Sequence, residues 1–201
     1  MAGTTDVEIC SNALVLIGHR PIQSLAGGSD SVLTCNSVYP LMREAFLTEH
    51  RWNFTIVGAQ LNRQVATPDM RFDYQYTLPA DNLLDGILAG YPSGDTGAKP
   101  VVDFVIQDGL LLSNRTEMWC EYRKSVGEED FPAYFSKALV LMLAADMALV
   151  LTDSPLVQGR LDRKAELAFR SARSIDAQSA PPNNVIHDFT LITAAHAPVP
   201  T

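Results

Sequence analysis

An almost continuous apolar run between residues 139 and 151 restricts the fold of this chain. It contains nine large apolar side chains, and Asp146 is its only charged residue. A helix of this composition has no polar face, so other elements must cover it on nearly every side. The run is shorter than the ~20 residues that a helix needs to cross a bilayer. We therefore predict that it forms the central helix of a bundle, and we expect no membrane contact.

Helix signals lie on both sides of this run. Acidic residues 128–130 and Pro132 precede it, and both negative charge and proline favour the first turn of a helix. Ser154 and Pro155 follow it as the N-cap and first residue of a last helix. That helix is expected to end before Pro181. Its predicted apolar stripe is Val157, Leu161, Ala165, Ala168, Ala172 and Ile175.

Two more helices are predicted near the N-terminus. Thr5 and Glu8 have the spacing of a capping box, which predicts a helix over about residues 5–17 with Gly18 as its stop. The second helix is predicted to start at Ser29 or Asp30. Its stripe is Val32, Cys35, Tyr39, Met42 and Phe46. Pro40 interrupts this pattern, so the helix either kinks there or a new one begins.

Residues 72–126 have a different character, because β-prone runs alternate with turn residues. The runs are Tyr74 to Leu78, Val101 to Ile106, Leu110 to Ser113 and Thr116 to Tyr122. Asp108-Gly109 permits positive φ and predicts a hairpin. The stretch 90–100 contains three glycines and two prolines, and we expect an exposed loop there.

These patterns predict an α+β protein that is mainly helical. We expect an antiparallel helix bundle with an inserted small β region and an extended C-terminal tail. Residues 1–71 would supply the N-terminal helices of the bundle and 72–127 the inserted β region. Residues 128–180 would supply the C-terminal helices and 181–201 the tail.

The charge balance limits the possible partners. Fifteen Lys and Arg against 23 Asp and Glu give a net charge of −8, which disfavours a protein that grips nucleic acid through its phosphates. The three cysteines, Cys10, Cys35 and Cys120, have neither disulfide-framework nor zinc-site spacing. We expect reduced thiols in a cytoplasm. The N-terminus has no basic and apolar segments of the secretory type, so we expect no signal peptide.

Motifs for catalysis are weak in this sequence. Four scattered histidines, no phosphate-binding Gly-rich loop and no Gly-x-Ser-x-Gly elbow lead us to predict no catalytic, cofactor-binding or metal-binding residues. A Cys or Ser nucleophile would have no recognisable partner. Carboxylate chemistry stays open through the cluster 128–130 and through Asp146, although charge at a helix N-terminus explains the cluster. We expect Asp146 to be buried and paired with an Arg of the last helix or of a neighbouring subunit.

Two segments are unusual for an acidic chain. The last helix carries five basic and three acidic residues, and we predict Arg160, Arg163 and Arg170 as subunit contacts. The C-terminal tail has no Lys or Arg. Its large apolar residues are Val185, Ile186, Phe189, Leu191 and Ile192. They predict either an edge strand that folds back or a segment that docks on a partner.

Several sequence pieces together resemble the tail tubular protein A family, the head-to-tail adaptors of short-tailed bacteriophages. The pieces cover about residues 5 to 180 and are Asn12-Ala13-Leu14-x-x-Ile17-Gly18-x-x-Pro21-Ile22-x-Ser24-Leu25, Tyr39-Pro40-x-x-Arg43, Trp52-Asn53-Phe54, Tyr76-x-Leu78-Pro79-Ala80-Asp81, Phe131-Pro132-x-x-Phe135-x-x-Ala138-Leu139, Leu143-Ala144-Ala145 and Ala172-x-Ser174-x-Asp176-Ala177. Two features depart from the pattern: Thr55 stands where Ala is frequent, and residues 90–100 have no clear counterpart.

The resemblance implies a structural protein of the virion, without cofactor, that is not an enzyme. It implies a ring, commonly of twelve copies, between the portal protein above and tail nozzle or tail-tube proteins below. The C-terminal segment, with Val185, Ile186, Phe189, Leu191 and Ile192, would reach the portal. DNA would pass through the ring without specific binding. The alternatives are a small carboxylate-dependent cell-wall hydrolase and a scaffold or regulatory protein that forms no ring.

Overall fold

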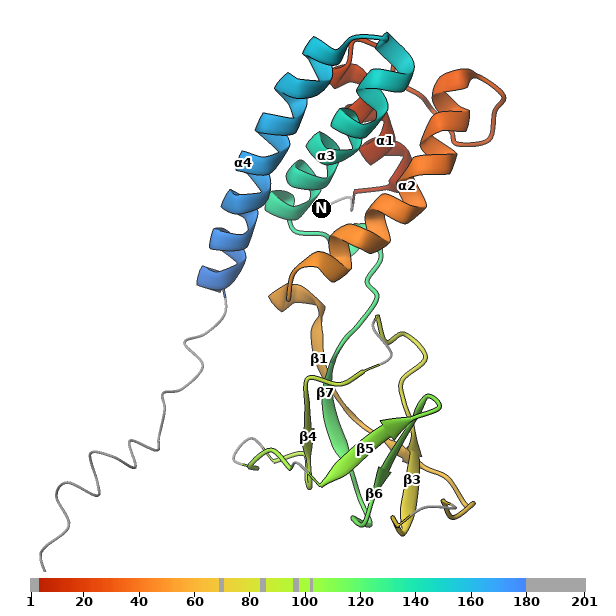
Figure 1. Cartoon of the computed structure of the whole chain (residues 1–201), viewed down its shortest axis with the longest axis vertical. Helices are drawn as coiled ribbons and strands as arrows, with labels where there is room; N and C mark the ends of the chain where they lie inside the picture. The colour runs from red at the N-terminus through yellow and green to blue at the C-terminus, as the bar shows by residue number, and fades with distance from the viewer. Residues whose placement is uncertain (1–3, 69–70, 84–85, 96–97, 102, 180–201) are drawn as a thin grey trace, which may run out of the picture.

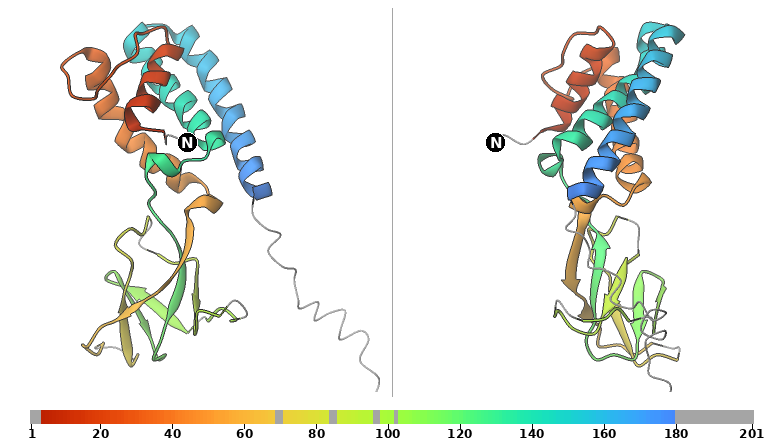
Figure 2. Two further views of the ribbon diagram at one scale, coloured as in Figure 1. Left: turned by 180° about the vertical axis from the view of Figure 1, so that it is seen from behind. Right: turned by 90° about the vertical axis from the view of Figure 1, so that its left-hand side faces the viewer.

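The computed structural model describes residues 4–68, 71–83, 86–95, 98–101 and 103–179. It is a mixed helix and strand protein, as an α+β class requires. Its helices are α1 (Asp6–Leu16), α2 (Asp30–Glu49), α3 (Ala133–Thr152) and α4 (Pro155–Ser179), with short 3₁₀ helices η1 (Asn53–Thr55) and η2 (Glu128–Asp130). Its strands are β1 (Ile56–Gln60), β2 (Asn62–Arg63), β3 (Tyr74–Thr77), β4 (Ala89–Tyr91), β5 (Phe104–Gln107), β6 (Leu110–Ser113) and β7 (Trp119–Arg123). The helices gather at one end of the molecule and the strands at the other (Figures 1 and 2).

The apolar helix α3 lies among the other three helices. α1, α2 and α4 all pack against it, and eight of its residues are buried. Among the described residues it is the one helix that is long and apolar enough, by length and composition, to cross a membrane. Of its most apolar stretch of 18 residues, 44% is buried inside the protein. The expectation of burial nearly all round is wrong at its C-terminal end, where Leu149 and Val150 are 43% and 67% exposed. Among the described residues, no element buries these two side chains.

The helix ends follow the predicted caps closely. The Glu8 N–H donates to Thr5 Oγ1 at 3.2 Å and the Thr5 N–H to Glu8 Oε2 at 3.1 Å, which is the capping box. Gly18 has a φ of +87° just beyond the end of α1. Ser29 caps α2, and its hydroxyl accepts from the Val32 N–H at 3.4 Å. Of the two possibilities at Pro40, the structure has one helix that runs through it.

The entry to α3 differs from the prediction. Pro132 is the N-cap and lies one position before the first turn, because residues 128–130 form η2 instead of joining the helix. At the other end of α3, Ser154 and Pro155 begin α4 as predicted. The Ser154 hydroxyl accepts from the Val157 N–H at 3.4 Å. The acidic residues therefore act in the connection between strands and helices, away from the helix dipole.

The buried stripe of α4 differs from the prediction at its C-terminal end. Leu161, Ala165 and Ala172 are buried, but Ile175 is 45% exposed and Asp176 is fully buried. Position 176 follows Ala172 by one helical turn, so it lies on the buried face whatever its side chain is. A pattern built from apolar residues alone selected Ile175, because it could not include a buried aspartate at position 176.

The strands form two antiparallel sheets with the orders β1-β7-β4 and β2-β3-β6-β5. The predicted hairpin joins β5 to β6, with Gln107 opposite Leu110. Its two turn residues, Asp108 and Gly109, have φ values of 51° and 74°, as a two-residue type I′ turn needs. A second core lies under these sheets and consists of Leu61, Tyr76, Leu111, Met118, Cys120 and Tyr122.

Three strands were missed. β1 and β2 fall within residues 1–71, which we predicted to supply bundle helices, and β4 extends into the first two residues of the predicted loop 90–100. Gly58 and Ala59 give β1 little strand propensity, but β1 pairs with β7 along its whole length. Gly90 is buried in β4, and a Cβ there would come within 3.1 Å of the Met118 and Phe104 side chains. Partners distant in sequence therefore determine both strands.

An aromatic cluster joins the two ends of the molecule. Neighbouring ring centroids lie 4.6 to 6.4 Å apart. The rings come from α2, α3, α4 and the two connecting segments, and they are Phe46, Trp52, Phe54, Phe131, Phe135 and Phe169. We call these six residues the aromatic joint.

Candidate functional site

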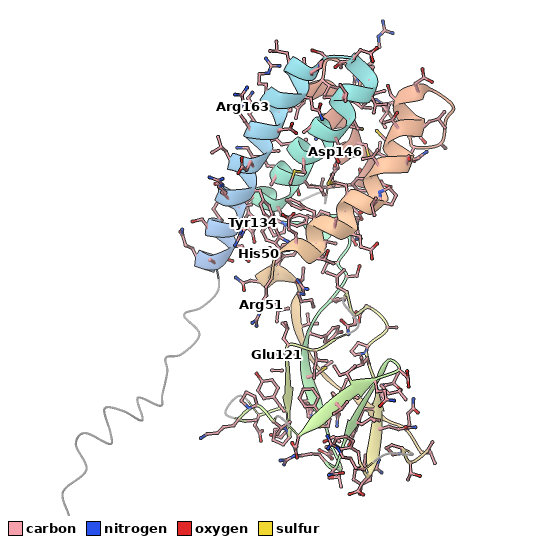
Figure 3. All side chains as sticks on the ribbon, viewed as in Figure 1. His50, Arg51, Glu121, Tyr134, Asp146 and Arg163 are labelled. Atoms are coloured by element: carbon pink, nitrogen blue, oxygen red, sulfur yellow. The ribbon has the colours of Figure 1, made fainter. Side chains whose placement is uncertain are left out.

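The outer face of α4 is the most unusual surface of the described residues. Six exposed residues on it follow a repeating spacing of four and three, and they are Leu156, Arg160, Arg163, Leu167, Arg170 and Ser174. This spacing keeps them in one row along a helix, and the row lies opposite the buried stripe. Leu156 and Leu167 are 84% and 65% exposed. We call this row the α4 seam; Figure 3 shows Arg163 on the outer side of α4.

The structure brings the three predicted interface arginines together on this seam. The Arg163 Nε donates to the Gly159 carbonyl oxygen at 3.0 Å, and Arg170 pairs with Glu166 of the same helix. Arg160 makes no ion pair within the described residues. Exposed pairs along one helix contribute only ~0.3–0.5 kcal/mol, so these guanidinium groups can exchange their contacts for a partner's carboxylates at little cost. The arginines stay a prediction as subunit contacts, and Leu156 and Leu167 join them only in the structure, where all five side chains share one exposed row.

A basic notch adjoins the seam where the helices meet the strands. It is a cavity of about 310 Å³ lined by His50, Arg170, Arg173, Ser174 and Ala177. The Arg173 guanidinium lies 5.7 Å from the centre of the Phe169 ring. Burial, and then the charge of Arg173, lower the pKa of His50 below its usual 6.5. We call the two segments that connect helices and strands, residues 50–55 and 124–132, the neck. Positive charge thus extends from the seam to the neck, where Figure 3 places His50.

Asp146 does not have the predicted environment. It is exposed, and no arginine of α4 pairs with it within the described part of the chain. Partial burial and the nearby carboxylate of Asp162 raise its pKa above the usual 3.8. The prediction of a buried carboxylate paired with an arginine of α4 is wrong, because position 146 is exposed beside Asp162 of α4 and no α4 arginine forms an ion pair with it. The alternative of a partner in a neighbouring subunit stays a prediction.

Glu128 belongs to an ion pair that ties the strands to α2. Its Oε1 accepts from Arg43 Nε at 2.7 Å and from the Tyr39 hydroxyl at 2.8 Å. Arg43 also donates to the Val126 carbonyl oxygen. Burial alone would raise the pKa of Glu128, but the hydrogen bonds from Tyr39 and the charge of Arg43 outweigh it and hold the pKa below 4.5. This geometry suits a structural carboxylate better than a general acid.

Removing this carboxylate is expected to change how stability depends on pH. Because the pKa of Glu128 is lower in the folded state, its contribution is present above the unfolded value and is lost as pH falls through the folded value. We expect Glu128→Gln to cost about 1.5–3 kcal/mol at pH 7 and progressively less below pH 4.5. Urea unfolding at pH 7, 5 and 3.5 measures this. Glu129→Gln is the control, because Glu129 is exposed; an E128Q difference that is constant with pH would contradict the assignment.

Asp176 holds the end of α4 against the neck. Its carboxylate is fully buried and accepts from the Asn53 backbone N–H at 2.9 Å and from the Tyr134 hydroxyl at 2.7 Å. The Asn53 side chain donates in return to the Asp176 carbonyl oxygen at 2.6 Å. Burial and the Asp176 carboxylate both raise the pKa of Tyr134. The sequence pieces Trp52-Asn53-Phe54 and Ala172 to Ala177 are thus two sides of one contact.

The other candidate groups do not converge on a reaction site. Cys10, Cys35 and Cys120 are buried, and burial raises the pKa of all three thiols, so none has the character of a nucleophile. Within the described ranges, no three His, Cys, Asp or Glu side chains are grouped to hold a metal. An apolar groove of about 460 Å³ lies between α1 and α3, where Val15, Leu16, Val140 and Leu141 line it.

The predicted portal contacts, Val185, Ile186, Phe189, Leu191 and Ile192, lie outside the described residues. No protein-family model matches the sequence, and no curated protein matches it either.

Proposed function

We propose that this chain is a structural adaptor that forms a ring between the portal and the tail of a bacteriophage. The observation that carries the proposal is the α4 seam, a long helix face that combines two exposed leucines with three arginines opposite the core. A monomer gains nothing from solvent-exposed leucines at 84% and 65%, whereas an interface buries them.

In this proposal the helices form an antiparallel bundle that is the wall of the ring. The seam, with Arg160, Arg163 and Arg170, faces a neighbouring copy. The strands lie at the end of the molecule opposite the helices (Figure 1). In this proposal that end contacts tail nozzle or tail-tube proteins. The tail 181–201 extends to the portal and contacts it through its apolar side chains. Twelve copies are the number that the resemblance implies.

The charge of the chain supports a passive role toward DNA. A ring of chains with a net charge of −8 repels phosphates, so DNA can pass through the lumen without being held by counterion release. The arginines would be covered at the contacts between copies. The protein would act in the virion, at the head-to-tail junction, after synthesis in the host cytoplasm.

Electron microscopy of the purified chain with and without its portal protein tests this proposal. We expect rings in the presence of portal, and a chain that ends at residue 182 should lose portal binding. Unchanged portal binding by the shortened chain would make the assignment of the tail wrong. A chain that stays monomeric in both samples would contradict the adaptor, and it would favour the scaffold or regulatory alternative.

A further inference from the structure

We infer that the α4 seam binds a second copy of this chain, and that the receiving surface is the exposed face of α3 around Asp146 together with Asp162 of α4. This inference rests on the proposed function, because it names the two faces that would close the ring. It goes beyond that proposal by giving the contact a direction and a partner residue set.

The chemistry of the seam defines what can bind it. Arg160 and Arg163 require carboxylates or phosphates, and Leu156 and Leu167 beside them require apolar contact. A phosphate backbone would satisfy the guanidinium groups and leave the leucines in water. A protein surface that combines acidic and apolar side chains satisfies both.

The chain itself has such a surface. Asp146, Leu149 and Val150 share one face of α3, because residues three and four apart lie side by side on a helix. All three are exposed, and Leu149 and Val150 are 43% and 67% exposed. Asp162 of α4 lies close enough to act on Asp146 electrostatically. We call these four residues the acidic patch.

Neither Asp146 nor Asp162 forms an ion pair in the part of the chain that the structure describes. Two adjacent carboxylates repel each other, so a cation brought by a partner relieves a cost already present in the free chain. The patch and the seam therefore complement each other in charge and in apolar area.

The two surfaces face different directions, so one copy cannot satisfy itself. Asp162 and Arg163 are consecutive on α4, and consecutive helix residues point about 100° apart. Seam-to-patch contact consequently joins different faces of two copies, which is a heterologous contact. Contacts of that type repeat from copy to copy and close into a ring when the rotation allows.

Charge reversal tests the pairing. The seam variant carries Arg160→Glu and Arg163→Glu, and the patch variant carries Asp146→Arg and Asp162→Arg. Each variant places like charges opposite each other when copies meet, so each alone should lose at least about tenfold in self-association under the conditions where the unchanged chain forms rings. All four positions are exposed, and circular dichroism should give melting curves like that of the unchanged chain.

An equal mixture of the two variants is the decisive sample. In an alternating ring, the reversed seam of one variant meets the reversed patch of the other, and the unchanged seam meets the unchanged patch. Every contact is then complementary, so rings should return in the mixture although neither variant forms them alone. Electron microscopy and sedimentation measure this. Arg63→Glu with Lys99→Glu is the matched control, because it changes the net charge as the seam variant does at two exposed positions among the strands, away from both surfaces.

The outcomes separate the inference from the proposed function. If the unchanged chain never forms rings, the proposed function fails. If the unchanged chain and the seam variant both form rings, the function stands and the seam contact is wrong. If the seam variant alone is defective and the mixture does not recover, the seam binds another surface and the acidic patch is overturned. If the seam variant forms intact rings but binds DNA more weakly than the unchanged chain, the arginines are assigned to nucleic acid instead.

Discussion

Phe135→Ala is expected to destabilise the protein by about 3–5 kcal/mol, the cost of removing a fully buried aromatic side chain. Phe135 has no exposed surface, and it contacts four other rings of the aromatic joint. Its removal leaves a cavity where α2, α3 and both connecting segments meet, and packing around such a site collapses only in part. The loss should therefore exceed that of any single surface substitution.

Urea unfolding measures this cost, and the two tryptophans report on both ends of the molecule. Trp52 lies in the aromatic joint and Trp119 in β7, so a Trp119→Phe background isolates the fluorescence of the joint without removing one of its rings, and the difference from the unchanged chain reports on β7. Phe135→Leu should cost less, because leucine refills part of the volume. Leu41→Ala is the control at a residue that is 73% exposed, where we expect a change within about 0.5 kcal/mol. A Phe135→Ala protein as stable as the control would show that the joint is not a packed core.

Local signals predicted the helices well. The capping box at Thr5, the proline after Ser154 and the apolar run of α3 each act within one or two helical turns, so the sequence contains all the information they need. The hairpin at Asp108 and Gly109 is equally local, because the positive φ values belong to the turn itself.

Elements that depend on distant partners escaped prediction. β1 contains Gly58 and Ala59 and becomes a strand because β7 pairs with it more than 60 residues later. Asp176 entered the prediction only as one of three acidic residues of the last helix, whereas its carboxylate is buried and accepts hydrogen bonds from Asn53 and Tyr134 of two other elements. Hydrophobic periodicity cannot detect a buried carboxylate, because its burial is compensated by hydrogen bonds and not by apolar contact.

The candidate interface was half visible in the sequence. Excess basic charge on the last helix selected Arg160, Arg163 and Arg170. It did not select Leu156 and Leu167, which lie in the same row. Their spacing of four and three could have revealed it, because that repeat is the pattern of a helix that meets a partner along its length. Asp146 was chosen for the wrong reason, since it is exposed on α3 and not buried within the helices.

Asp176→Ala is the second substitution with a large expected effect, about 2–4 kcal/mol, because it leaves two buried donors without an acceptor. The donors are the Asn53 backbone N–H and the Tyr134 hydroxyl, and both point at the fully buried Asp176 carboxylate. Asp176→Asn keeps one acceptor oxygen and should cost less. Equilibrium unfolding gives both values.

A double-mutant cycle identifies the contact that is responsible. Tyr134→Phe removes one of the two donors, so the cost of Asp176→Ala should be smaller by about 0.5–3 kcal/mol in that background. Asp162→Ala is the matched control on the same helix, because Asp162 is exposed and should affect assembly without changing stability beyond about 0.5 kcal/mol. Additive costs for positions 176 and 134 would contradict a direct contact between the Asp176 carboxylate and the Tyr134 hydroxyl. If instead the two effects couple as expected, the hydrogen bonds of Asp176 fix the C-terminal end of α4 to the neck. The seam on the outer face of α4 then has a fixed position relative to the rest of the chain.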